Sequence, residues 1–105
     1  MDHDDLTLQK CRALLHTLYG TRLHGIVLYG SCARGAEARE SDIDLMVLLE
    51  CPVDVSQEIR RMWEVLYPLQ LESDRLLSVV PADVGLYNCG EYALYRQAKA
   101  EGMAL

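Results

Sequence analysis

The chain has 105 residues, of which half are apolar and a quarter are charged. That length supports one hydrophobic core, so a single domain over residues 1–105 is expected. Ten basic against sixteen acidic residues give a net charge of −6, the wrong sign for gripping a nucleic-acid backbone. No segment approaches the roughly 18 continuous apolar residues of a membrane span, and the acidic start lacks the features of an export signal. A cytoplasmic protein without membrane or nucleic-acid partners is therefore expected.

The four cysteines are scattered, and no two stand in a C-x-x-C arrangement: Cys11, Cys32, Cys51 and Cys89. This spacing argues against a zinc site and against a disulfide framework. Reduced thiols, mostly packed, are expected.

The hydrophobic pattern predicts alternating helices and strands. In chain order these are a helix over 6–19, a strand over 24–29, a short helix over 32–40, a strand over 42–49, a helix over 55–66, a strand over 74–80 and a helix over 91–101. Such an order calls for an α+β layered fold, with helices packed against a small sheet.

Several residues mark the expected ends of these elements. Gly20 and Gly102 offer stops for the first and last helices. Asp54 can cap the helix over 55–66, Pro68 is expected to end it, and Pro81 is expected to end the strand that precedes it.

The turn after the first strand has the composition of a phosphate-binding loop. Gly30 follows the strand directly, where a residue without Cβ lets the backbone approach a ligand, and Ser31 adds a hydroxyl. Backbone amides that open the next helix would add donors. Taken alone, Gly-Ser is also a common structural turn.

Two aspartates begin the second strand. Asp42 and Asp44 are two positions apart, so their side chains leave the same face, with Ile43 pointing the other way. Two convergent carboxylates make a Mg²⁺ site of the kind used in phosphoryl transfer. Taken alone, Asp-x-Asp also occurs at solvated strand starts.

Together these segments form one ordered motif: Gly30-Ser31-x-Ala33-Arg34-Gly35, followed by Ser41-Asp42-Ile43-Asp44-Leu45. The motif resembles the signature of the DNA polymerase beta nucleotidyltransferase superfamily, and specifically that of the minimal nucleotidyltransferases of bacteria and archaea. The resemblance implies a nucleotidyltransferase fold with a three-stranded mixed sheet in sequential order, flanked by helices.

The resemblance also implies roles for individual residues. Gly30, Ser31, Arg34 and Gly35 would bind the nucleoside triphosphate, and the aspartate pair would hold Mg²⁺, with two ions expected. For Arg34, a salt bridge to Glu37 or Glu40 within the loop is an equally good interpretation.

Catalytic members of the superfamily usually bring a third carboxylate from the third strand. In this chain Ser78 stands about where that acid is expected, and Glu72 and Asp74 share its parity. Asp74 is the preferred candidate for a third metal ligand and catalytic acid beside Asp42 and Asp44. An ordinary solvated acid at the strand start is the alternative at both acidic positions.

By resemblance, the expected activity is transfer of a nucleoside monophosphate, AMP from ATP or another nucleoside triphosphate, to an acceptor hydroxyl. Many relatives are encoded beside a small helical HEPN protein, so the expected acceptor lies on such a toxin and the chain acts as its antitoxin. The alternative is a catalytically weak nucleotide-binding or partner-binding module that neutralises its partner by contact. Exposed apolar residues would favour association, including formation of a homo-oligomer; the candidates are Tyr67, Leu69, Leu71 and the tail at the end of the chain.

Overall fold

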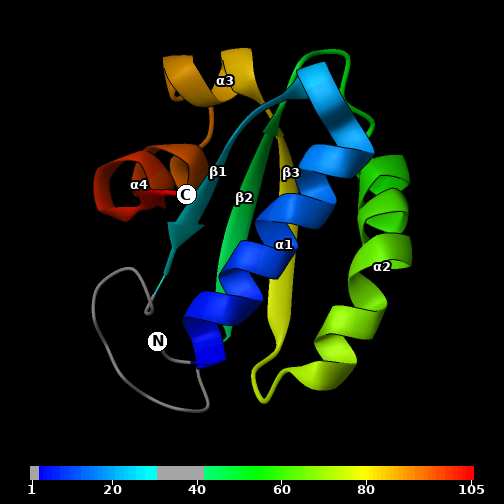
Figure 1. Cartoon of the computed structure of the whole chain (residues 1–105). Coiled ribbons are helices and arrows are strands. Elements are labelled where there is room, and N and C mark those ends of the chain that lie inside the picture. Colours follow the sequence, from blue (N-terminus) through cyan, green and yellow to red (C-terminus); the bar gives the residue numbers. More distant parts are fainter. Residues whose placement is uncertain (1–2, 31–41) are drawn as a thin grey trace.

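The computed structural model describes the backbone of residues 3–30 and 42–105, and the side chains from Leu6 onward within these ranges (Figure 1). The elements are α1 (His3–Tyr19), the short 3₁₀ helix η1 (Gly20–Arg22), β1 (Leu23–Tyr29), β2 (Ile43–Leu49), α2 (Val55–Glu72), β3 (Leu77–Asp83), α3 (Val84–Cys89), α4 (Ala93–Glu101) and β4 (Met103–Ala104). The short helix expected over 32–40 lies outside the described residues. Within them, no helix is both long and apolar enough to span a membrane.

The strands form one mixed sheet in the order β3-β2-β1-β4. Strand β2 runs parallel to β3 and antiparallel to β1, and β4 is antiparallel to β1. The α+β architecture and the sequential order of the first three strands are therefore as predicted. The two-residue strand β4, absent from the prediction, adds a fourth strand beside β1.

Helices cover both faces of the sheet. Figure 1 shows α1 and α2 side by side across one face, where they bury side chains such as Leu15 and Leu66 against Ile43 and Leu45. Helices α3 and α4 pack on the other face, where Tyr95 contacts a smaller core that includes Met46. Successive β2 side chains alternate between the two cores, so the parity of a strand residue tells which face it occupies.

Helix α2 continues past Pro68 to Glu72, and the prediction that this proline ends the helix is wrong. An interior proline removes one backbone hydrogen bond and costs about 3 kcal/mol. The apolar stripe of the helix continues beyond it, because Leu66 and Leu69 are both buried against the core, and this burial offsets the cost. Leu69 is thus not exposed as expected, whereas Tyr67 and Leu71 are exposed.

Strand β3 begins at Leu77 and runs through Pro81 to Asp83, so the expected bounds of 74–80 are wrong at both ends. The strand lies at the edge of the sheet. Ile43 N–H donates to the Leu76 carbonyl (2.9 Å), and the regular parallel pattern that follows turns the nitrogens of odd-numbered β3 residues away from β2. The missing N–H of Pro81 is therefore on the open edge, where a strand tolerates proline.

The chain after β3 contains a helix that the sequence pattern did not reveal. The Asp83 carboxylate accepts hydrogen bonds from the backbone N–H groups of Gly85 (2.8 Å) and Leu86 (3.2 Å), which starts α3 directly after the strand. The last helix begins at Ala93 and ends before Gly102, as predicted for its end. A side chain at Gly102 would collide with Val27 and with the Ala98 carbonyl, so glycine lets the chain turn tightly back against the sheet.

A buried acid joins the elements at the end of the sheet where β1 begins. The Glu58 side chain, in the first turn of α2, is only 5% exposed and accepts hydrogen bonds from the Tyr19 hydroxyl (3.1 Å) and the Arg22 guanidinium (3.2 Å). Arg22 also donates to the carbonyls of Glu50 and Pro52. Because these contacts connect α1, η1, the β2–α2 loop and α2, the cluster fixes the relative positions of these segments.

Candidate active site

Three polar side chains form a row across the sheet on the face that α3 and α4 partly cover. Asp44 lies opposite Tyr29 on one side and opposite Ser78 on the other. Ile43, its neighbour in sequence, is 2% exposed and points into the core beneath α1 and α2. The sheet thus turns Asp44 away from that core and centres it between β1 and β3.

Asp42 and Asp44 interact electrostatically. Burial raises the pKa of the Asp44 carboxyl, and the negative charge of Asp42 raises it further. Asp42 is exposed just before β2, and Asp44 is half-buried. Two like charges held together, one of them partly desolvated, favour a cation between them, and oxygen ligands of this kind suit a hard divalent ion. The pair therefore fits a metal such as Mg²⁺.

Gly30 closes the site from the β1 side. Its backbone adopts φ = +77°, a conformation that favours glycine. A Cβ at this position would lie 2.5 Å from Oδ2 of Asp44, so a larger residue would displace the carboxylate. The structure therefore brings together Gly30, Asp42 and Asp44 of the predicted site residues. Ser31, Arg34 and Gly35 lie outside the described residues, as do the alternative Arg34 partners Glu37 and Glu40, and their roles stay predictions.

Asp74 lies in the loop between α2 and β3, three residues before the strand begins. Glu72 ends α2 and pairs with Lys10 of α1 at 3.4 Å. Ser78 is the strand residue level with Asp44. Across residues 6–30 and 42–105, no three acidic, histidine or cysteine side chains gather as a metal-binding group. A role for Asp74 as third ligand accordingly stays a prediction.

Tyr29 is the neighbour of Asp44 that sequence reasoning missed. Burial raises the pKa of its phenol, and the Asp44 charge raises it further, so the hydroxyl stays protonated and remains a donor. The ring also packs against the core beneath α3 and α4. Its place beside Asp44 follows from the antiparallel register of β1 and β2, which no local sequence signal gives.

These features suit phosphoryl transfer more than acid–base or nucleophilic catalysis. The described part of the site offers carboxylates for a cation and a close backbone approach, and phosphoryl transfer asks a protein mainly for positioning and charge. None of the described cysteines takes part: Cys11 is buried, and Cys51 and Cys89 are free and exposed elsewhere.

Residues 8–87 match the nucleotidyltransferase domain family over most of the chain. The chain therefore belongs to the nucleotidyltransferase domain family. No curated protein sequence matches it significantly.

Among solved structures, the chain is similar to the toxin–antitoxin MntA-HpeT carrying a tyrosine-to-alanine substitution, with 28% identity and a TM-score of 0.61 over 92% of this chain and 69% of that chain. A toxin–antitoxin structure with AMP-PNP gives 28% identity and a TM-score of 0.62 over 91% and 69%. A further MntA-HpeT structure, with two aspartates changed to glutamate, shares the fold at 24% identity and a TM-score of 0.62 over the same shares.

Proposed function

We propose that the chain transfers a nucleoside monophosphate, AMP from ATP, to a hydroxyl of a partner protein and thereby acts as an antitoxin. The observation that carries the proposal is the Asp42 and Asp44 pair on the sheet face, with Gly30 packed against the second carboxylate. Membership in the nucleotidyltransferase family supports the reaction class.

The described residues of the site have the following roles in this reaction. Asp42 and Asp44 would hold Mg²⁺, which supplies positive charge beside the triphosphate when bound. Gly30 leaves room for the Asp44 carboxylate to lie against the backbone. The Tyr29 hydroxyl, kept protonated by its surroundings, holds the orientation of the Asp44 carboxylate or donates to a phosphate oxygen. The acceptor hydroxyl attacks the α-phosphorus, and pyrophosphate leaves.

The identity of nucleotide and partner is supported by the similar structures. One of them is a toxin–antitoxin with AMP-PNP, an ATP analogue, and another is a toxin–antitoxin MntA-HpeT variant. By similarity, we propose that the nucleotide is ATP and that the acceptor belongs to a toxin. The proposal that this toxin is of the small helical HEPN class comes from the motif resemblance.

The test combines purified chain, α-labelled ATP, Mg²⁺ and the protein encoded by the adjacent gene. We expect label on the partner with the wild type and none with Asp42→Asn. Mass spectrometry should show the added nucleoside monophosphate on a hydroxyl side chain. An unlabelled partner in the presence of a stable complex contradicts the transfer reaction.

A second candidate function rests on Ser78. A third acid level with Asp44 is absent there, and the described residues hold no group of three metal-binding side chains. A binding module that neutralises its partner by contact would have this composition. In that case the Asp42→Asn, Asp44→Asn double variant would still neutralise the toxin in cells, whereas an antitoxin that acts by transfer would lose its protection.

A further inference from the structure

The loop between α2 and β3 places an exposed apolar residue beside the candidate metal site. Leu76 is 56% exposed, although it is a leucine directly before a buried strand. Its carbonyl accepts a hydrogen bond from Ile43 N–H at 2.9 Å, so its backbone is fixed to the start of β2. The aspartate pair flanks Ile43 on both sides in sequence.

The β2–β3 ladder places the backbone of Leu76 at the start of β2, beside the aspartates. Ile43 pairs with Leu77 as the first pair of the parallel ladder, and Asp42 and Leu76 directly precede that pair. Leu77 is buried beneath α1 and α2. Because side chains alternate along a strand, Ser78 points to the opposite face, where Asp44 lies, and Leu76 is exposed just before the strand begins.

The loop is held rigidly by side-chain hydrogen bonds. The Gln70 amide donates to the Arg75 carbonyl (2.9 Å) and accepts from Leu77 N–H (2.7 Å). The Ser73 hydroxyl donates to the same Arg75 carbonyl at 2.9 Å. An apolar side chain on a preformed turn loses little conformational entropy on binding, which is the property of an interface anchor.

The charges around Leu76 select the partner. Asp42 and Asp74 are exposed, Arg75 is half-buried, and Lys10 pairs with Glu72. With a net charge of −6 over the chain, the surface complements a segment that carries an apolar side chain beside a basic one.

We infer that Leu76 is the docking anchor for the acceptor: a protein segment that places an apolar side chain on Leu76, a basic side chain near Asp74, and the acceptor hydroxyl toward Asp42 and Asp44. The inference rests on the proposed function for the identity of the hydroxyl donor. It assigns acceptor recognition to the loop before β3.

The experiment uses the protein encoded by the adjacent gene, α-labelled ATP and Mg²⁺, and compares the wild type with Leu76→Ser, Leu76→Met and Val55→Ser. Val55 is a matched control, because it is 49% exposed but begins α2 at the other end of the helix. We expect Leu76→Ser to raise KM for the partner about tenfold, as loss of one buried leucine contact implies. The kcat, the KM for ATP and the melting temperature of Leu76→Ser should stay unchanged. Leu76→Met, which keeps an apolar side chain, should have a partner KM close to that of the wild type. Added salt should raise the partner KM of the wild type.

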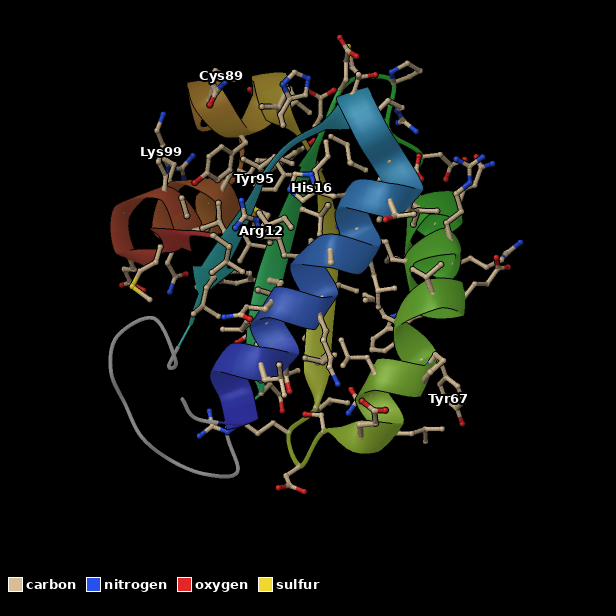
Figure 2. The ribbon with its side chains drawn as sticks, in the orientation of Figure 1. Arg12, His16, Tyr67, Cys89, Tyr95 and Lys99 are labelled. Atoms are coloured by element: carbon tan, nitrogen blue, oxygen red, sulfur yellow. The ribbon has the colours of Figure 1, made fainter. Side chains whose placement is uncertain are left out.

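The outcomes separate this inference from the proposed function. If the partner is labelled and Leu76→Ser keeps the wild-type partner KM, the docking inference is overturned and the transferase stands. If a complex forms without transfer, its Kd decides: a weaker complex with Leu76→Ser supports docking, and an unchanged one overturns it. The Tyr67 side chain projects from the outer side of α2 (Figure 2). If Tyr67→Ser weakens partner binding and Leu76→Ser does not, the partner docks on α2 and the inference is overturned. Absence of both complex and transfer with the wild type overturns both proposals.

Discussion

The backbone of Gly30 lies against the carboxylate of Asp44, so closely that a Cβ at position 30 would be 2.5 Å from Oδ2. The same glycine has φ = +77°. We therefore predict that Gly30→Ala both strains the backbone and displaces the carboxylate. Its loss of stability should exceed the roughly 1 kcal/mol expected from the conformation alone, and divalent-metal binding should weaken.

Gly20→Ala is the matched control, since Gly20 also has a positive φ (+56°) but has nothing within 4 Å of the added methyl group. Urea unfolding should show about 1 kcal/mol of destabilisation for Gly20→Ala with metal binding intact. Equal effects of both variants on metal binding would show that the contact with Asp44 is irrelevant.

Asp44 is expected to destabilise the metal-free fold at neutral pH. Its pKa is raised in the folded chain above the ordinary value of about 3.9, chiefly by burial and then by Asp42. The folded state therefore binds the proton more readily than the unfolded state, and stability is lost as pH rises through the folded pKa. Asp44→Asn should melt higher than the wild type at pH 7 in EDTA, and the difference should vanish below about pH 3.9.

Asp74→Asn controls for the loss of one negative charge, because Asp74 is exposed in the loop before β3. Thermal melts from pH 3 to pH 8 would check the prediction. Millimolar Mg²⁺ should stabilise the wild type and leave Asp44→Asn unchanged. A lower melting temperature of Asp44→Asn at pH 7 in EDTA would contradict the sign of the effect.

Ser78→Asp should strengthen the metal site. Position 78 pairs directly with Asp44 across the parallel ladder and shares its face. A third carboxylate there should tighten divalent-metal binding about tenfold, since affinity rises with the number of charged ligands. Isothermal titration calorimetry with Mn²⁺ would measure the affinity. Ser78→Asn is the control, because asparagine has the size of aspartate but no charge. Unchanged affinity in Ser78→Asp would place the metal away from this row.

The buried Glu58 cluster is expected to dominate electrostatic stability. Arg22→Met would leave the Glu58 carboxylate, which is 5% exposed, without its nearest cation, and should cost about 3 kcal/mol. Arg61, at 3.8 Å, can compensate only in part because it is half exposed. Adding Glu58→Met should recover most of that loss, because the buried charge is then gone.

Lys10→Met serves as the comparison, because the Lys10–Glu72 pair is exposed and should contribute at most about 1 kcal/mol. Urea titrations of the three variants would rank them. An Arg22→Met variant as stable as Lys10→Met would mean that the cluster adds nothing beyond a surface pair.

Sequence reasoning captured the elements whose signals are local. The strand at Leu23–Tyr29, the strand at Ile43–Leu49 and the stop at Gly102 follow from apolar runs and glycines next to them. It failed at Pro68 and Pro81, because both prolines are accommodated by their tertiary position: one on the exposed side of a helix whose stripe continues, the other on the open edge of the sheet.

The parts of the candidate site that depend on residue spacing within one strand were predictable. The parts that depend on how neighbouring strands pair were not. Strand alternation is enough to place Asp42 and Asp44 together. The positions of Tyr29 and Ser78 beside Asp44 depend on the register of two other strands, which only the folded sheet fixes. Asp74 was predicted to lie in the third strand because the loop before Leu77 continues the strand's alternation in sequence. In the fold, hydrogen bonds from Gln70 and Ser73 hold that loop outside the strand.

The edge of β3 has a further consequence for behaviour at high concentration. An open strand edge is a template on which another chain can add a strand and begin aggregation. Along this edge the Leu77 N–H is already bound by Gln70, and Pro81 has no N–H to offer. A fifth strand would therefore find too few consecutive backbone N–H donors on β3 to pair with it. Pro81, which was predicted to end the strand, thus helps to prevent another chain from adding a strand to this edge of the sheet.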